Sequence, residues 1–508
     1  MENSNFNLMY QADFYKVSHI AQYPDNVSHI HSTLVARKAC YNDNISKEEF
    51  MWFGHSLFLE KLEAFEQWFF TLTFEELCDV LKEYKIFLDT RLGADMDVAH
   101  WNELWKVRFL PITIHAMPER SIQKFQTPLL TVENIDSRFP WLVGFIETTM
   151  LSNIWPVSTA ANRAWHIRKV IEDSMKNHTE EEREAIDFMA HDFSYRGMPG
   201  DEAAMLTGCG HLANFKGSDT IPAARAMERV YGETTGFSVA ATEHSVMCAG
   251  GQEDEIETFK RLMKVYPTGI LSVVSDTWDY FGTLTDILPK MKSKIMKRDG
   301  KLVIRPDSGN PIDIICGKPF IDASKDFYEG DSLEDYLNDT IWETNLNEGD
   351  KGLVWDGVDW WSFDVELFYD YECDFVSVKN IQPHERTFED RGSLELLGET
   401  FGYTYDSQGL KLLDPHIGLI YGDGMNQERI KEILERMVAL GWSPLNMVFG
   451  VGAYTYQFVT RDELSWAFKA TAIKRDGEWV AIKKDPKTDP GKASLSGRFF
   501  EPDFVNIF

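Results

Sequence analysis

Several common sequence features are missing from this chain of 508 residues, and each absence excludes a class of protein. The six cysteines are scattered without a Cys-x-x-Cys pair, which argues against a zinc site or a disulfide framework and favours the reducing cytoplasm. No long apolar run and no signal-peptide pattern is present, so no membrane span or secretion is expected. The Walker A loop, Gly-x-Ser-x-Gly and His-Glu-x-x-His are also absent, which excludes the enzyme classes that these motifs mark.

Positive charge is scarce as well. The chain has 51 Lys and Arg against 81 Asp and Glu, for a formal net charge of −30. Such a protein repels nucleic acid and anionic membranes at long range, so neither is expected as a partner. Residues 321–374 alone hold 17 acidic side chains and two lysines. If the substrate is an anion, a local cluster of arginine and lysine elsewhere in the chain must bind it.

Short apolar runs that end in polar or glycine-rich turns recur along the middle of the chain. Most are followed by about 15 residues of helical pattern, and their spacing fits βα units except for one long gap. The seven runs are residues 187–193, 212–215, 237–241, 270–274, 302–304, 417–420 and 447–449. The pattern predicts an α/β protein with an incomplete, seven-stranded α/β barrel whose chemistry lies at the carboxyl ends of the strands.

Both ends of the chain have a different pattern. Helices are expected at residues 50–70 and 74–87 and strands at 110–114 and 129–132, and a further helix begins at 140. Two more strands are expected at 465–473 and 479–482. We therefore expect a mixed α+β or β-sandwich domain made of residues 1–145 with 465–508, a barrel domain of 146–464, and an acidic insertion of 313–415 within the barrel.

The apolar run at 302–304 is followed by Arg305 and Asp307, and a Ser-Gly-Asn-Pro turn comes directly after them. A guanidinium fork suits phosphate or carboxylate, and a carboxylate suits a sugar hydroxyl or a metal. A strand-end ion pair is an equally good interpretation of this segment alone. The recurrence of charged or polar residues at the ends of the runs favours a functional site over an isolated ion pair. The other runs are followed by Arg196, Asp219, His244, Asp276 and Asp423.

These residue types together indicate a phosphate and sugar site. Arginines and glycine-turn amides bind phosphate, and the aspartates beside them suit ribose hydroxyls and Mg²⁺. An aspartate that orients His244 would make it a better base or nucleophile. The aromatic side chains of Phe193 and Tyr195 flank one of the turns, where they either stack on a flat ring or pack in the core.

Seven of these stretches, in order, resemble the nicotinamide phosphoribosyltransferase family. They are residues 191–197 (HDFSYRG), 214–220 (NFKGSDT), 241–245 (ATEHS), 273–276 (VVSD), 304–311 (IRPDSGNP), 421–424 (YGDG) and 460–462 (TRD). Residues 13–17, 22–24 and 131–136 resemble the same family. The resemblance covers most of the chain outside the acidic insertion.

The resemblance implies a reaction of nicotinamide with 5-phosphoribosyl 1-diphosphate that gives nicotinamide mononucleotide and diphosphate. It implies Mg²⁺ as cofactor and ATP as an optional co-substrate, hydrolysed through a phosphohistidine at His244. It also implies a homodimer with shared sites, in which Phe193 and the partner's Tyr15 sandwich the pyridine ring. Asp219 would accept a hydrogen bond from the carboxamide.

The remaining roles are also carried over from the family. Arg196 would face the ring and the diphosphate, and Asp276 and Asp307 would act with His244 in catalysis. The phosphoribosyl group would be held by Arg305, Asp307, Gly422 and Asp423, and phosphates would be held by Arg37, Ala453, Arg461, Lys469 and Lys484. Ligands for the metal are not assigned.

Three departures from the family pattern stand out. The family's glycine-rich Gly-Ser-Gly-Gly-Gly loop is Gly-Val-Gly-Ala-Tyr at residues 450–454, which predicts a tighter phosphate pocket. The acidic insertion has no counterpart in the animal enzymes, and the chain ends soon after Arg498.

Three other functions were weighed. A nicotinate phosphoribosyltransferase would share the fold, but Asp219 would repel the carboxylate of nicotinate. A non-catalytic sensor of nicotinamide or its nucleotide is disfavoured by the presence of His244, Asp276, Arg305 and Asp307. An unrelated barrel enzyme acting on a sugar phosphate is disfavoured by the ordered motifs.

Overall fold

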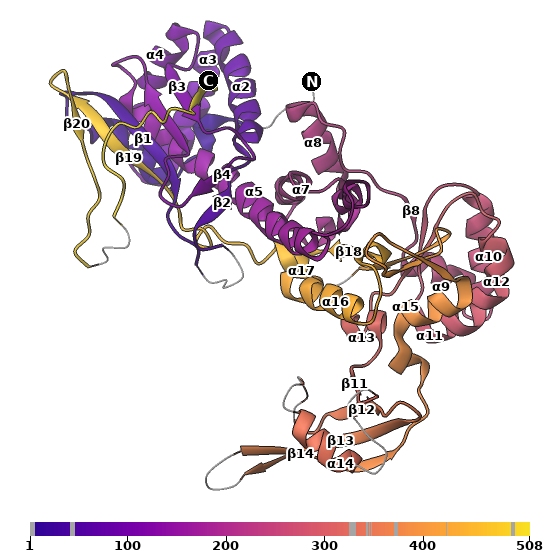
Figure 1. Cartoon of the computed structure of the whole chain (residues 1–508). Coiled ribbons are helices and arrows are strands. Elements are labelled where there is room, and N and C mark those ends of the chain that lie inside the picture. The colour runs from indigo at the N-terminus through magenta and orange to yellow at the C-terminus, as the bar shows by residue number, and fades with distance from the viewer. Residues whose placement is uncertain are drawn as a thin grey trace. The chain divides into compact units, whose positions relative to one another are not determined.

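The computed structural model of the chain (Figure 1) describes residues 6–40, 46–324, 332–341, 344, 346, 348–369, 374–422, 424–488 and 493–508. It contains two compact units. The first comprises Met1–Lys169, Ala190–Ser238 and Val451–Phe508, and the second comprises Val170–Met189 and Val239–Gly450. The predicted domain limits stay a prediction.

A six-stranded antiparallel sheet organises the first unit, and both ends of the chain contribute to it. Its order is β20-β19-β1-β5-β3-β21. The strands are β1 (Val27–Ala36), β3 (Ile112–Ala116), β5 (Leu130–Asn134), β19 (Trp466–Arg475), β20 (Glu478–Ala481) and β21 (Val505–Asn506). The pairing of β1 with β19 places the indigo and yellow strands side by side in Figure 1. The prediction that both chain ends build one mixed α+β region is confirmed.

Helices α2 (His55–Thr71), α3 (Phe74–Leu92), α4 (Ala99–Val107) and α5 (Pro140–Ser174) complete the first unit's amino-terminal part. A capping box at Thr73 starts α3, and Gly93 in the left-handed conformation ends it. The helix predicted from residue 50 begins later, because residues 49–51 form strand β2 (Glu49–Met51) and pair with β4 (Ile122–Lys124). Gly54 separates strand from helix with φ +108°, and a Cβ there would lie 2.2 Å from Val157 Cγ1.

A seven-stranded sheet carries the barrel pattern, with order β7-β6-β18-β17-β10-β9-β8. The strands are β6 (Ala190–Asp192), β7 (Gly217–Ser218), β8 (Ala240–Ala241), β9 (Leu271–Val274), β10 (Leu302–Arg305), β17 (Ile417–Tyr421) and β18 (Met447–Val451). Pairings such as β10 with β9 and with β17 are parallel. The predicted incomplete barrel of seven strands is confirmed. One run was assigned wrongly, because residues 212–215 end helix α7 (Asp201–Leu212) and the strand follows them at β7.

The long gap in the pattern corresponds to a subdomain that interrupts the helix after β10. That helix is present as two pieces, α13 (Pro311–Cys316) and α15 (Phe388–Phe401). The pieces meet at Gly317 and Gly392, where a Cβ on Gly392 (φ +73°) would lie 2.1 Å from the Gly317 nitrogen. The chain therefore leaves the barrel and returns to it at the same place.

Between these pieces, the described residues within 320–383 form what we call the insertion subdomain. Its sheet has the order β11-β12-β13-β14, from β11 (Phe320–Asp322), β12 (Lys351–Trp355), β13 (Trp360–Tyr369) and β14 (Asp374–Pro383). Helix α14 (Leu333–Thr340) supplies Leu337 to a small separate core that also contains Val354, Phe363 and Val378. A core of its own makes this part of the chain a folded subdomain.

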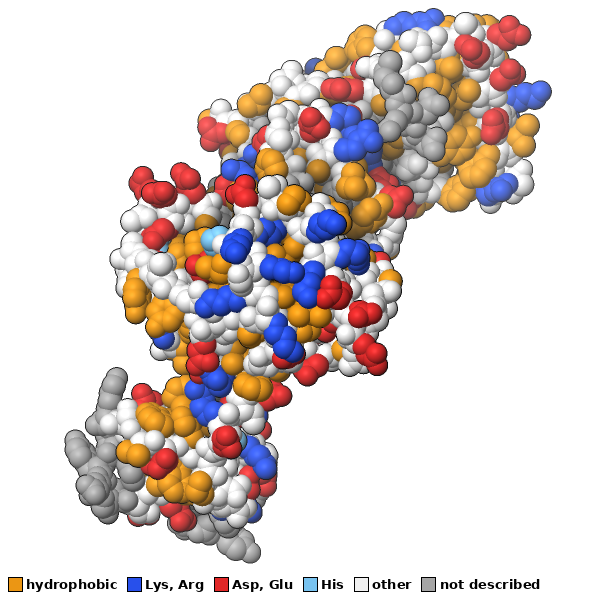
Figure 2. All heavy atoms as spheres, turned by 90° about the vertical axis from the view of Figure 1, so that its right-hand side faces the viewer, with side chains coloured by type: hydrophobic (Ala, Val, Ile, Leu, Met, Phe, Trp, Pro, Cys, Tyr) orange, Lys and Arg blue, Asp and Glu red, His pale blue; other side chains and the backbone are white. Residues whose placement is uncertain are grey.

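Acidic side chains are spread over the face shown in Figure 2, as the net charge of −30 requires. None of the helices in the described part of the chain has the length and apolar character needed to cross a membrane. The cytoplasmic location expected from the cysteines stays a prediction.

A buried acid lies at the start of helix α10 (Glu255–Val265), which precedes β9. Glu255 begins this helix and is only 6% exposed. Burial and the neighbouring Asp279 carboxylate raise its pKa to about 7, against a smaller opposing effect of the Thr283 hydroxyl. Since the folded state binds the proton more tightly than the unfolded state, this group lowers stability as the pH rises from about 4.5 through about 7.

We therefore predict that Glu255→Gln stabilises the protein at pH 8 by about 2 kcal/mol, a value reduced for partial solvation. The gain should shrink toward zero near pH 5, because the wild-type side chain is then protonated. Thermal unfolding across this pH range measures the difference. Glu257→Gln on the same helix is the control, since Glu257 is exposed and paired with Lys260. A gain that is constant with pH would contradict the prediction.

Candidate functional site

Two aspartates are held together at the ends of strands β9 and β10 in the second unit. Asp276 Oδ2 accepts hydrogen bonds from the Asp307 backbone N–H (2.9 Å) and from Ser308 Oγ (2.6 Å). The Asp276 side chain is 4% exposed, while that of Asp307 is 25% exposed. The more buried carboxylate therefore fixes the loop that presents the more accessible one.

His244 stands opposite both carboxylates. It opens helix α9 (His244–Gly250), and its side chain is 49% exposed. Nε2 lies 3.9 Å from Asp276 Oδ1 and 3.8 Å from Asp307 Oδ2, while Nδ1 is 3.1 Å from Thr277 Oγ1. With Nδ1 engaged by the threonine, Nε2 is the ring atom directed toward the carboxylates.

Arg305 and Gly422 complete this group. Arg305 Nη2 donates to the Thr242 carbonyl (3.0 Å), and its Nε lies 3.3 Å from Asp307 Oδ1. A Cβ on Gly422 would lie 2.4 Å from Asp307 Oδ1, so any larger residue there would displace the carboxylate. Asp423, the other predicted ribose ligand, lies outside the described residues.

A second group lies at the ends of β6 and β7 in the first unit, and Asp192 organises it. This carboxylate is fully buried. Its Oδ1 accepts from the Ser194 N–H (2.9 Å), and its Oδ2 accepts from Ser218 Oγ (2.9 Å) and Thr220 Oγ1 (2.7 Å). A buried charge with this many donors is stabilised, and it fixes the loop on either side of Asp219.

Asp219 itself is partly exposed, with 42% of its side chain accessible. Its Oδ1 lies 2.8 Å from His191 Nε2 and accepts from Ser238 Oγ at 2.5 Å. The His191 ring lies against Phe193, with centroids 4.7 Å apart and planes inclined by 42°. An aromatic ring and an oriented carboxylate are thus adjacent at one strand end.

The turn after β6 also approaches the loop after β18. A Cβ on Gly197 would lie 2.2 Å from the Cβ of Ala453, the first residue of α17 (Ala453–Tyr456). Arg196 is exposed beside this contact, and the Tyr195 hydroxyl donates to Asp201 Oδ1 (3.1 Å). Tyr195 therefore lies at the surface of the turn, in contact with helix α7.

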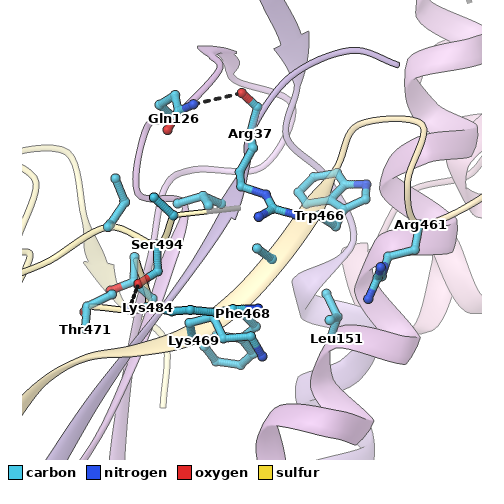
Figure 3. A pocket seen from close by; sticks show the side chains of 15 residues that line it. Arg37, Gln126, Leu151, Arg461, Trp466, Phe468, Lys469, Thr471, Lys484 and Ser494 are labelled. Carbon is cyan, nitrogen blue, oxygen red and sulfur yellow. Dashed lines mark hydrogen bonds between the residues drawn. The ribbon is translucent and has the colours of Figure 1, made fainter. Parts of the chain in front are cut away.

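A cavity of about 300 Å³ in the first unit gathers four cationic side chains that the sequence singled out for phosphate (Figure 3). They are Arg37, Arg461, Lys469 and Lys484. Lys469 is paired with Glu147 (3.0 Å) and Arg461 with Asp462 (2.7 Å). Lys469, Arg461 and Asp462 are about half exposed, whereas Glu147 is mostly buried. Figure 3 shows the charged ends of Arg37, Arg461 and Lys469 around one space. This is the local positive cluster that an acidic protein needs in order to bind an anion.

The residues present fit a magnesium ion that is shared with a phosphate ligand. In the described part of the chain no group of three or more His, Cys, Asp or Glu side chains could hold a metal by itself. Asp276 Oδ1 is buried and has no hydrogen-bond partner among the described residues. Carboxylate oxygens of this kind suit Mg²⁺, which in proteins commonly takes one or two carboxylates together with substrate phosphates.

The structure brings the predicted residues into three groups. His244, Asp276, Arg305, Asp307 and Gly422 form the first, Phe193, Arg196, Asp219 and Ala453 the second, and the four cations the third. Tyr15 is 59% exposed and belongs to none of them. The roles assigned to all these residues stay predictions.

Sequence reasoning missed the groups that orient the predicted residues: the side chains of His191, Asp192, Ser238 and Thr277 and the backbone carbonyl of Thr242. A signal existed for His191, which lies in β6 two residues before Phe193, because residues two apart along an extended chain are on the same side, and the two rings are in contact. No signal of this kind marks Ser238, which lies before β8 and 19 residues from Asp219, or Thr277, which follows β9 and is 33 residues from His244.

Comparison with known proteins identifies the family of the chain. The model of the nicotinate phosphoribosyltransferase (NAPRTase) family matches residues 188–364 and 371–508, and that of the nicotinamide phosphoribosyltransferase N-terminal domain matches residues 7–67. The nicotinamide phosphoribosyltransferase of Acinetobacter baylyi is 34% identical over 96% of this chain and 86% of its own length. That of Mycoplasma pneumoniae is 32% identical over 100% of this chain and 98% of its own length.

Among solved structures, human nicotinic acid phosphoribosyltransferase aligns with 91% of this chain and 75% of its own length. The alignment has 14% identity and a TM-score of 0.47, so the family is shown by the family models and the sequence relatives. Matched over most of its length, the chain belongs to the nicotinate phosphoribosyltransferase family and is a pentosyl-transferring enzyme.

Proposed function

We propose that this enzyme transfers the 5-phosphoribosyl group of phosphoribosyl diphosphate to nicotinamide, giving nicotinamide mononucleotide and diphosphate for NAD biosynthesis. The observation that carries the proposal is the Asp219 carboxylate, held by His191 and Ser238 beside the Phe193 ring. A carboxylate accepts a hydrogen bond from the N–H of a carboxamide, and the ring of Phe193 suits a flat pyridine. Both curated relatives described above carry the name of this activity.

The second candidate is transfer to nicotinate, because the family model that matches the barrel bears that name. Asp219 disfavours it. Nicotinate would place its own carboxylate against that of Asp219, and like charges at a partly desolvated site cost several kcal/mol. Asp219 Oδ1 lies 2.8 Å from His191 Nε2 and accepts from Ser238 Oγ, so the carboxylate is held in place at the end of β7.

The chemistry requires separation of charge at the anomeric carbon. The C1–O bond to diphosphate breaks as the pyridine nitrogen forms a bond to C1, so positive charge develops on the ribose and negative charge on the leaving group. Asp307, beside Arg305, would hold the ribose, while Arg305 and the cations of the first-unit cavity would take the phosphates. Mg²⁺ held by Asp276 and Asp307 together with the diphosphate would neutralise part of the leaving charge.

The proposal includes ATP as a co-substrate. In the proposed reactive tautomer, Nδ1–H would donate to Thr277 Oγ1, 3.1 Å away, and the lone pair of His244 would be on Nε2. Nε2 would attack the γ-phosphorus of ATP, the bond to ADP would break, and water would later take the phosphoryl group as phosphate. Asp276 and Asp307 would stabilise the positive imidazole ring during this step.

We also propose a homodimer with shared sites. Phe14 and Tyr15 are 46% and 59% exposed in a single chain, which leaves two aromatic rings for a second copy to cover. The partner's Tyr15 would lie on the other side of the pyridine from Phe193. The function requires the three groups of residues described above to border one cavity, within one chain or across the two copies.

The proposed function is tested by product formation. Purified protein with phosphoribosyl diphosphate and Mg²⁺ should convert nicotinamide to its mononucleotide and should convert nicotinate at least about 100-fold less efficiently, because of the like-charge cost. Chromatographic detection of both mononucleotides, with and without ATP, measures this. Product from nicotinate alone would reject the proposal in favour of the second candidate.

Asp219→Asn should lower kcat/KM for nicotinamide by about tenfold to 100-fold, since a charge-assisted hydrogen bond is replaced by a neutral one. It should also narrow the preference over nicotinate, because the repelling charge is gone. Steady-state kinetics with each pyridine measures both effects. The control is Asp201→Asn, which removes the charge of a nearby carboxylate that accepts the hydrogen bond of the exposed Tyr195 hydroxyl. Equal losses for the two pyridines would contradict the role of Asp219 in selectivity.

His244→Ala should abolish ATP hydrolysis while slow synthesis of the mononucleotide continues. Without the Nε2 lone pair no phosphoenzyme forms, whereas transfer to nicotinamide does not need one. ADP release and acid-labile ³²P labelling of the protein measure this effect. His416→Ala is the control, because His416 forms a separate pair with Asp414. Persistence of labelling in His244→Ala would exclude this residue as the phosphate acceptor.

A further inference from the structure

Ser393 joins two segments that follow the strand ends of the second unit. It is fully buried on α15, and its Oγ donates to the Ile314 carbonyl of α13 (2.6 Å). The Tyr280 hydroxyl lies 2.7 Å from the same oxygen. Since the Ser393 hydrogen is used toward Ile314, Tyr280 donates to Ser393. One hydroxyl thus binds α11 (Tyr280–Gly282) to α13.

Both segments lead directly from the paired aspartates. Tyr280 follows Asp276 by four residues, and Ile314 follows Asp307 by seven. Burial raises the pKa of the Tyr280 hydroxyl, the hydrogen bond with Ser393 lowers it, and the charge of Asp276 makes a smaller raising contribution. The loop after β10 is bound on its other side as well, where the Tyr421 hydroxyl donates to the Gly309 carbonyl (2.9 Å).

The insertion subdomain is attached beside Ser393 by a second buried group. Asp390 accepts hydrogen bonds from Lys318 Nζ (2.8 Å) and His384 Nε2 (2.8 Å), and these two residues flank the subdomain on its two sides. Burial would raise the pKa of Asp390, but the bonds from Lys318 and His384 outweigh it and lower the pKa to about 2. The carboxylate is therefore charged at neutral pH, and it holds both connections of the subdomain.

The kink in α15 places this group against Ser393. Gly392, between Asp390 and Ser393, packs on Gly317 so closely that no side chain fits. Arg436 of α16 (Gln427–Ala439) donates from Nη2 to the Gly317 carbonyl (2.5 Å) and pairs with Asp313 (3.2 Å). A displacement of the connections at Asp390 would therefore move Ser393 and α13 together.

We propose that Ser393 is a positioning residue for phosphoribosyl transfer, which sets the spacing of Asp276 and Asp307 through Tyr280 and Ile314. The insertion subdomain, held at Asp390, determines how tightly Ser393 is held and thus the affinity for phosphoribosyl diphosphate. This inference rests on the proposed function and assigns a role to a part of the chain that the reaction does not otherwise use. Nicotinamide, placed at Asp219 on other strands, is not affected.

The test uses the full chain and measures binding of phosphoribosyl diphosphate with Mg²⁺ by calorimetry, in the absence of pyridine. Ser393→Ala should weaken binding by about fivefold, the value of one hydrogen bond, and Asp390→Asn should weaken it in the same direction. The KM for nicotinamide should stay within about twofold of wild type. This split is the readout that general loss of structure would not give.

Ser158→Ala and Asp414→Asn are the matched controls. Ser158 is a fully buried serine whose Oγ has no hydrogen-bond partner among the described residues, and Asp414 forms a histidine pair remote from the subdomain's connections in sequence. If Ser393→Ala does not fold, Tyr280→Phe, which removes only the hydroxyl, gives the same test. Unchanged binding in the folded variant, or an equal rise in the nicotinamide KM, would overturn the inference.

The wild-type measurement separates this inference from the proposed function. A wild-type protein that binds phosphoribosyl diphosphate but makes no nicotinamide mononucleotide would defeat the proposed pyridine substrate and leave the positioning role to be decided by Ser393→Ala alone. A wild-type protein that does not bind phosphoribosyl diphosphate would overturn both.

Discussion

In both units a carboxylate at the end of one parallel strand holds the loop that follows the neighbouring strand. Asp192, the last residue of β6, accepts hydrogen bonds from Ser218 and Thr220, and Asp276 after β9 accepts them from the Asp307 backbone and Ser308. Both carboxylates are almost completely buried. Burying a charge is costly unless donors surround it, so the loops cannot move away without exposing an unpaired charge. The positions of Asp219 and Asp307 depend on this constraint.

Four cationic side chains of this acidic protein are grouped in the first-unit cavity. A protein of net charge −30 repels phosphates except where its cations are grouped, and the first-unit cavity groups four. The partner of Arg461 is the exposed Asp462, and surface pairs of this kind contribute little to stability, whereas Glu147, the partner of Lys469, is only 15% exposed. A phosphate ligand can therefore replace Asp462 at small cost, since its oxygens offer stronger, charge-assisted hydrogen bonds.

The position of the insertion subdomain is compatible with an intact sheet. It interrupts a helix on the outside of the barrel pattern, and β10 before it still pairs with β9 on one side and with β17 after it on the other. Gly317 and Gly392 allow the backbones of the two connections to pack against each other. The subdomain buries apolar side chains in a core of its own. An insertion into a strand would instead have shifted the register of every pairing beyond it.

The sequence by itself determined the class of fold, because seven apolar runs at βα spacing permit few alternatives, and it determined which strand ends carry Asp276, Arg305 and Asp307. It did not place the strand after residues 212–215, since a short apolar run fits a helix end equally well. Only the tertiary structure showed that His191 and Ser238 hold Asp219, and that Ser393 meets Tyr280 from 113 residues away. The spacing of apolar residues is a local property that can be seen in the sequence. Hydrogen bonds between side chains from distant segments form only after the fold has brought those segments together.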